Sequence, residues 1–250
     1  AVSVPGIDWF SLHSSREQLL LLRDLAFRPE AVSAALAVFE RKIAQLQRPQ
    51  DRWQPRQVLL FSGHMVDRPG RALPRFPAAA EAIAAKAIDD AVGALDPGAD
   101  DLALSQAAAG GDLLFLEACQ RRGVRCQIML PFAEPEFIER SVLPSIDGAR
   151  WRDRYYAASA AANTSVRAMP SEVGALPDAS DPFERCNLWL LYTALAAGIE
   201  KTRFVTLWNG EGGDGPGGTA HLAREIKRHT GRVVWLDTRE LFRSLLPGKA

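Results

Sequence analysis

The chain has 250 residues, of which 47% are hydrophobic and 24% are charged. This composition is typical of a globular protein with one large core, and it argues against extended disorder. Thirty Lys and Arg residues balance thirty Asp and Glu residues, so the chain lacks the net positive charge that attracts nucleic acid non-specifically. We therefore predict no nucleic-acid partner.

Cysteine usage and hydropathy bear on the cellular location. Cys119, Cys126 and Cys186 are an odd number, have no metal-ligand spacing and lie in apolar stretches, which is typical of a reducing cytoplasm. Charges interrupt the longest apolar stretches well short of the roughly 20 residues of a membrane span, and no export signal is visible. We predict a cytoplasmic location and no membrane partner. The start at Ala1 rather than Met is typical of a trimmed or excised piece of a longer protein.

The first 50 residues predict a helical element. Apolar residues recur at helical spacing over residues 16–47, with Pro29 at the start of the second of two helices. The stretch 48–56, rich in Gln, Pro and Arg, resembles a linker, so we divide the chain into residues 1–50 and 51–250. The helical pair either docks a homo-oligomer partner or an attached effector module, or covers one face of the sheet that follows.

After the linker, short apolar runs alternate with helical segments. This alternation indicates a parallel sheet with crossover helices, so the predicted fold class is α/β, a Rossmann-like three-layer parallel sheet with an N-terminal helical element. Asp181 followed by Pro182 is a helix start signal. The predicted strands are 58–62, 102–105, 124–130, 165–168, 204–208 and 233–236. The predicted helices are 78–95, 112–122, 134–142, 151–158, 182–197 and 219–229.

Glycines and small polar residues follow three of these strands. The carboxyl ends of parallel strands open on one edge of the sheet, where helix N-termini bring unpaired backbone donors. Glycine lets the backbone approach a ligand closely, and a helix dipole favours an anion. We therefore predict a phosphate-bearing small-molecule ligand. The residues expected near it are Ser62, Gly63, Ser105, Gly110, Gly111, Asn209, Gly210, Gly213, Gly215, Gly217, Gly218 and Thr219.

These turns have simpler interpretations as well. A single Gly-Gly before a helix is often only a turn, and the six glycines between Gly210 and Gly218 can form a plain connection, although a connection without a role could be much shorter. Neither cluster is a Walker A sequence, because no Gly-Lys-Ser/Thr follows. Neither gives Gly-x-Gly-x-x-Gly directly after the first strand.

The order of these motifs resembles the SLOG superfamily, which includes DprA and LOG proteins, the N-terminal region of TRPM channels and ligand sensors of bacterial defence and signalling. The motifs are a strand ending in Ser62-Gly63, a helix opening at Gly110-Gly111-Asp112, a strand ending in Pro131-Phe132 and a helix opening at Pro216-Gly217-Gly218-Thr219. The resemblance covers roughly residues 57–237. It implies a pocket for a nucleotide or an NAD-derived ligand, with the glycines and Thr219 near the phosphates.

The sequence departs from the enzymatic branch of that superfamily. At the second motif, LOG-type phosphoribohydrolases have a pattern that looks like Pro-Gly-Gly-x-Gly-Thr-x-x-Glu. In this sequence Arg224 occupies the position of that glutamate, and Glu225 lies one position further. One residue turns a helical side chain by about 100°. We therefore favour a sensor over a hydrolase of that mechanism.

Several charged and titratable residues are candidates for ligand contact. His64 and His221 are expected to face the pocket as donors or as an acid or base, with a solvent-facing helix position as the alternative for His221. Arg75 is expected to clamp a phosphate or to be a solvated loop residue. Asp112 is expected to be a helix N-cap or a ligand contact, and Glu117 to lie on an exposed helix face or to bind a ribose hydroxyl.

Two acids on the glycine loop, Glu211 and Asp214, are a weak cation signal, and we predict no metal. Three functions follow. The first is a cytoplasmic sensor that binds a nucleotide-type ligand and transmits its occupancy. The second is a hydrolase or transferase at the N-glycosidic bond of a nucleotide, or an NADase, with Glu117, Glu211 or Glu225 as the carboxylate. The third is a protein-interaction domain that has lost its ligand.

Overall fold

The protein is built on one parallel sheet of six strands, in the order β4-β3-β2-β1-β5-β6. The structure is a computed structural model, and it describes residues 9–45, 53–169, 180–211, 219–229 and 232–246. Every neighbouring pair of strands is parallel. The strands are β1 (Val58–Gly63), β2 (Leu102–Ser105), β3 (Arg125–Leu130), β4 (Thr164–Ala168), β5 (Thr202–Trp208) and β6 (Val233–Asp237). The predicted α/β fold class is confirmed.

The strand order reverses its direction at β1. From β1 the chain adds β2, β3 and β4 outward on one side, then returns to add β5 and β6 on the other. The central strand therefore pairs with both β2 and β5, with Val58 opposite Leu102 and Thr202. In such sheets, ligands bind in the crevice outside the carboxyl ends of the strands where the order reverses. Here the order reverses between β1 and β5, and we call the edge beyond their carboxyl ends the switch-point crevice.

Helices cover both faces of the sheet. Successive residues of β1 point to opposite faces, so Leu59 and Phe61 belong to one buried cluster while Val58 and Leu60 belong to the other. The first cluster is covered by α3 (Glu81–Gly93), α4 (Gly111–Arg121), α5 (Glu134–Ser141), α6 (Gly148–Ser159) and the segment around α9 (Thr238–Leu241). The second is covered by α7 (Pro182–Ala196) and α8 (Thr219–His229).

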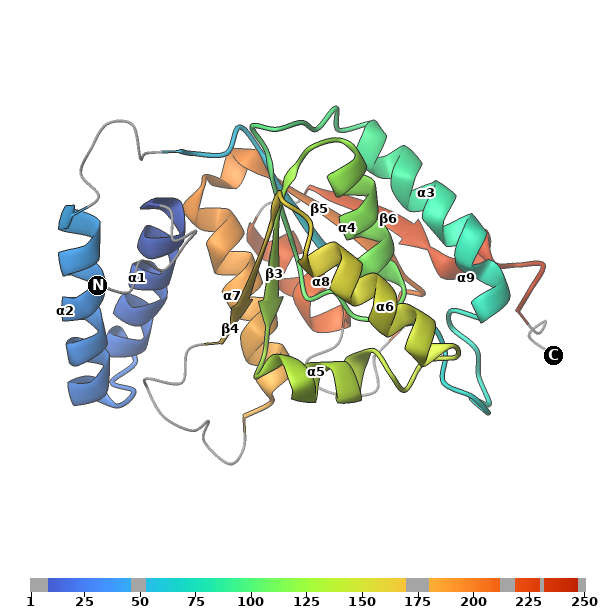
Figure 1. Cartoon of the computed structure of the whole chain (residues 1–250), viewed down its shortest axis with the longest axis horizontal. Coiled ribbons are helices and arrows are strands. Elements are labelled where there is room, and N and C mark those ends of the chain that lie inside the picture. Colours follow the sequence, from blue (N-terminus) through green and yellow to red (C-terminus); the bar gives the residue numbers. More distant parts are fainter. Residues whose placement is uncertain (1–8, 46–52, 170–179, 212–218, 230–231, 247–250) are drawn as a thin grey trace.

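The N-terminal helices α1 (Trp9–Asp24) and α2 (Pro29–Gln45) form a helical pair. They share a small buried cluster of Leu19, Val32 and Leu36. Figure 1 shows the pair beside α7, far from α3 and α9. Two polar contacts fix α1 there, since the Ser14 hydroxyl donates to Thr193 Oγ1 on α7 at 2.9 Å and Arg167 donates to Ser15 Oγ at 2.8 Å. The pair thus packs on a helix that itself covers the sheet.

The predicted elements are all present, and most of them have shifted ends. The segment predicted as one helix over 78–95 begins with a short 3-10 turn, Ala78–Ala80, before α3. Asp112 is not an N-cap: α4 begins at Gly111 and its N-cap is Gly110. The predicted cap at Asp181 is confirmed, because its carboxylate accepts from the Glu184 amide at 2.8 Å. No described helix combines the length and the apolar character that a membrane crossing requires.

Candidate functional site

The loops that follow β1 and β2 are joined to each other at the switch-point crevice. Met65 and Gly110 form an isolated antiparallel bridge, and the Val66 amide donates to the Ala109 carbonyl at 3.0 Å. The Gly111 amide donates to the His64 carbonyl at 3.1 Å. These bonds hold the start of α4 against the end of β1.

Gly110 is required by this close approach. Its φ is +114°, a conformation that other residues rarely adopt, and a Cβ at this position would lie 2.7 Å from the Val66 amide nitrogen. A Cβ at Gly111 would lie 3.1 Å from the ring of Phe61. The glycine pair is therefore explained by the packing of one turn on another.

His64 links the two strands at the point where the order reverses. Its side chain is 7% exposed, and Nε2 accepts a hydrogen bond from the Asn209 amide at 3.1 Å. The His64 amide donates to the Leu207 carbonyl at 2.8 Å. Because Nε2 is an acceptor, the imidazole in this arrangement is neutral, with its proton on Nδ1. His64 thus fixes the turn after β5 relative to the end of β1.

The start of α8 reaches the same point. The Ser62 hydroxyl, near the end of β1, donates to Thr219 Oγ1, the first residue of α8, at 3.3 Å. Both residues are partly exposed. The positive end of a helix dipole and two hydroxyl groups therefore meet at the carboxyl end of the central strand, which is an arrangement that favours an anion.

Asp112 is a nearly buried acid in the first turn of α4. Its carboxylate is 7% exposed and accepts from the Ala108 amide at 3.3 Å. Burial raises the pKa of Asp112 to about 7, and hydrogen bonds from Ala108, Gly63 and Gln106 offset part of that rise. The buried Ser105 hydroxyl lies near the carboxylate and lowers its pKa, although its geometry falls short of a hydrogen bond. Because Asp112 already uses these amides, an incoming anion is better placed at α8.

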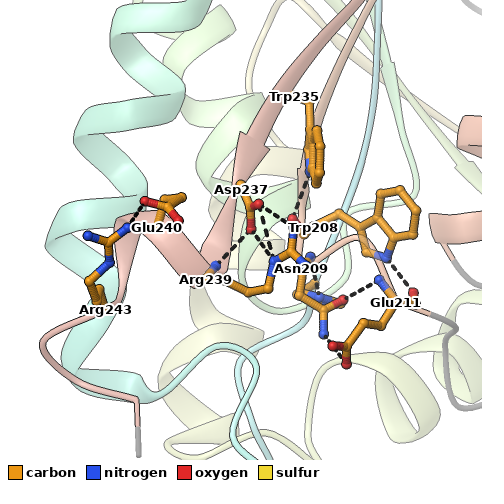
Figure 2. A network of polar contacts seen from close by, with 9 residues as sticks. Trp208, Asn209, Glu211, Trp235, Asp237, Arg239, Glu240 and Arg243 are labelled. Carbon is orange, nitrogen blue, oxygen red and sulfur yellow. Dashed lines mark hydrogen bonds and ion pairs between the residues drawn. The ribbon is translucent and has the colours of Figure 1, made fainter. Parts of the chain in front are cut away.

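The turn after β5 is held by a local network, shown in Figure 2. The Glu211 amide donates to Asn209 Oδ1 at 3.1 Å, and Trp208 Nε1 donates to the Glu211 carbonyl at 2.7 Å. Trp235 Nε1 on β6 donates to the Trp208 carbonyl at 2.8 Å. These bonds fix the turn from Trp208 to Glu211 at the end of β5.

Two tryptophans stand beside this turn. The rings of Trp208 and Trp235 have centroids 6.0 Å apart, and Trp235 is 46% exposed. Gly210, at φ +78°, passes close to the Trp235 ring, where a Cβ would lie 3.2 Å away. Arg239 lies over that ring at 5.7 Å and is paired with Asp237. An exposed aromatic surface next to a polar crevice suits a flat, partly apolar group.

Other predicted site residues lie elsewhere or cannot be placed. Glu117 is bonded to Arg154 of α6 at 2.6 and 2.7 Å, and Arg154 also pairs with Glu81 of α3 at 2.6 Å, so Glu117 joins three helices. Arg75 contributes its amide to the buried carboxylate of Asp67 at 3.0 Å. Gly213, Gly215, Gly217 and Gly218, and the His221 side chain, lie outside the described part of the chain.

Two features of the site were not predicted from the sequence. One is Trp235, and the other is the contact in which Gln106 Nε2, beyond β2, donates to Asn187 Oδ1 of α7 at 2.9 Å. Neither has a local sequence signal, because each depends on strands or helices that meet only in the fold. Within the described ranges, no group of three or more His, Cys, Asp and Glu side chains could hold a metal ion.

The fold and the site together define a doubly wound parallel α/β protein with polar side chains gathered at its switch point. Over nearly its whole length the chain matches the structure of DNA processing protein A (DprA) from Streptococcus pneumoniae, covering 98% of this chain and 100% of that one at 11% sequence identity and a TM-score of 0.34. No protein-family model matches the sequence, and no curated protein matches it. The proposals below rest on the strand order and the contacts of the site.

Proposed function

We propose that this chain is a sensor or regulatory domain that binds a nucleotide or an NAD-derived molecule in the switch-point crevice. The observation that carries the proposal lies beyond the carboxyl ends of the paired strands β1 and β5. There Ser62 bonds to Thr219 at the N-terminus of α8, and His64 bonds to Asn209. A phosphate at Thr219 would gain the α8 dipole and the two hydroxyl groups. The resemblance of the glycine-rich turns to those of the SLOG superfamily supports the same class of ligand.

The tryptophans suggest where the rest of such a ligand lies. Trp235 is exposed at 46% and lies next to the turn that leads from β5 toward α8. A nucleobase stacks well on an indole ring, and such stacking is worth about 1–3 kcal/mol. In this arrangement the phosphate lies at Thr219 and the base at Trp235.

A thermal-shift screen of the chain against ATP, NAD, ADP-ribose, nucleoside monophosphates and cyclic dinucleotides tests the proposal. A ligand at 100 times its Kd adds about 2.7 kcal/mol of stability, which gives a clear rise in Tm. We expect Ser62→Ala and Thr219→Val to weaken the binding of the responding ligand roughly tenfold, since each removes one hydrogen-bonding group. Ser159→Ala, a partly exposed position at the end of α6, is the matched control. If no compound raises Tm, the interaction-domain alternative replaces this proposal.

A hydrolase of the nucleotide N-glycosidic bond is the second candidate, and Asp112 favours it. A carboxyl group with a pKa of about 7 retains its proton at neutral pH often enough to serve as a general acid. Asp112 also lies beside Gly63 at the end of β1, whereas Glu117 is paired with Arg154. Chromatography of NAD, ADP-ribose and AMP after incubation distinguishes the two functions. Turnover that Asp112→Asn abolishes, with binding retained, would establish the enzyme.

A further inference from the structure

An apolar groove lies between the N-terminal helices and α7. Its volume is about 390 Å³, which is within the range of small-molecule sites. All three helices contribute side chains to it. The principal apolar ones are Leu19, Leu22, Val38, Phe39, Leu188 and Trp189.

The groove is open to solvent along one side. Leu25 is 68% exposed, Val38 is 48% exposed and Leu21 is 39% exposed, and all three line it. Large apolar side chains left exposed side by side mark interaction sites in folded proteins. The helical pair therefore packs on α7 without closing the space between them.

Among the described residues that line this groove, Arg185 is the one with a charged side chain. It lies on the face of α7 that also carries Leu188, Trp189 and Tyr192, at helical spacing of three, four and seven residues, and it lines the groove with them. Its Nε is buried and, among the described residues, has no hydrogen-bond partner. Burial lowers the pKa of the Arg185 guanidinium.

The charges around the groove leave Arg185 without a counter-ion in the described part of the chain. Asp181, one turn earlier on α7, caps the Glu184 amide. Arg167, on β4, adds positive charge and is bonded to Ser15 Oγ at 2.8 Å. A half-buried guanidinium without an anion is unfavourable, and an anionic ligand would relieve that penalty.

We propose that this groove binds an elongated aliphatic molecule with a free carboxylate, whose head group pairs with Arg185 and whose chain lies along the apolar faces of α1, α2 and α7. The planar guanidinium matches a carboxylate in two parallel hydrogen bonds. The site is separate from the switch-point crevice, so it stands or falls independently of the proposed nucleotide site.

Titration calorimetry with dodecanoate, below the concentration at which it forms micelles, tests this proposal. Methyl dodecanoate has the same chain without the charge, and we expect it to bind about ten- to a hundredfold more weakly, as the loss of a hydrogen-bonded ion pair predicts. Arg185→Leu should weaken dodecanoate to the level of the ester and leave the ester unchanged. Arg152→Gln, an exposed arginine on α6, should change neither.

A second variant tests where the aliphatic chain of the ligand lies. Val38→Asp puts a carboxylate at an exposed position of the groove wall, where folding is undisturbed and an anionic ligand is repelled, so we expect dodecanoate binding to fall at least tenfold. The proposal is overturned if dodecanoate does not bind, if the acid and the ester bind equally, or if binding ignores Val38→Asp. A dimer that buries the groove in the absence of any ligand, detected by sedimentation, would also overturn it.

Discussion

At the scale of single residues, Gly110 is the clearest case of a position that only glycine can occupy. Its φ is +114°, and a Cβ placed on it would lie 2.7 Å from the Val66 amide nitrogen, which leaves no room for a side chain. We expect Gly110→Ala to lower the free energy of unfolding by about 3 kcal/mol or more, because backbone strain and overpacking act together. Urea unfolding measures this. Gly70→Ala is the matched control, since Gly70 also has a positive φ, +75°, but nothing lies within 4 Å of its Cβ position, and it should cost only about 1 kcal/mol.

The raised pKa of Asp112 predicts that the stability of the protein depends on pH. Its pKa is raised from 3.8 to about 7 by burial, so between these values the folded state holds a proton that the unfolded state has released. Stability from this group is therefore greatest below pH 4, falls as pH rises toward 7 and is constant above. Asp112→Asn cannot titrate, so the wild type should lose up to about 4 kcal/mol relative to the variant between pH 4 and pH 8. Urea unfolding of both proteins over this range measures the difference, and parallel curves would contradict the assignment.

At the scale of elements, the start of α7 depends on Asp181. Its carboxylate accepts from the Glu184 amide at 2.8 Å, and Pro182 follows at the first helical position. We expect Asp181→Ala to lower the free energy of unfolding by about 1 kcal/mol. Asp153→Ala on α6 removes an exposed pair with Arg152 at 3.3 Å and should have an effect of about 0–0.5 kcal/mol. Equal effects of the two substitutions in urea unfolding would show that the cap does not stabilise the helix.

The elements also show which parts of the secondary structure could be predicted from the sequence. The strands were predictable because they are short apolar runs between helical segments, and β2 was predicted with its observed bounds. The helix α9 was missed because its four residues, Thr238–Leu241, are too short to show a period. The first helical turn of α4 was shifted because Asp112 looks like a cap, whereas its carboxylate turns back to the Ala108 amide.

Some features of the candidate site could likewise be predicted from the sequence, and others could not. The positions of Ser62, Gly63, His64, Gly110 and Gly111 were predictable, because carboxyl ends of parallel strands share one edge. The bond from the Asn209 amide to His64 was not, because it joins residues far apart in the sequence. The groove at Arg185 likewise depends on α1 and α2 lying against α7, and no local pattern predicts that placement.

At the scale of the whole molecule, one helix serves both candidate sites. On one side of α7, Asn187 accepts from Gln106 beyond the end of β2. On another side, Arg185 and Trp189 line the groove beside the N-terminal helical pair. A ligand in the groove would contact α7 directly, and a ligand at Thr219 would contact the start of α8, which packs with α7 over the same face of the sheet. This arrangement suits the proposed role of the domain as a sensor, because α7 lies between the sheet and the N-terminal helices, for which docking a partner is one of the two interpretations of the sequence.

The position of β1 also has a consequence for how the protein is made. The central strand pairs with β5 over its whole length, from Val58 opposite Thr202 to Gly63 opposite Leu207. During translation, residues 64–201 must therefore leave the ribosome before β1 gains its second neighbour. Until then the nascent sheet exposes an unpaired edge beside the apolar residues Leu60 and Phe61, which is the kind of surface that aggregates or recruits chaperones.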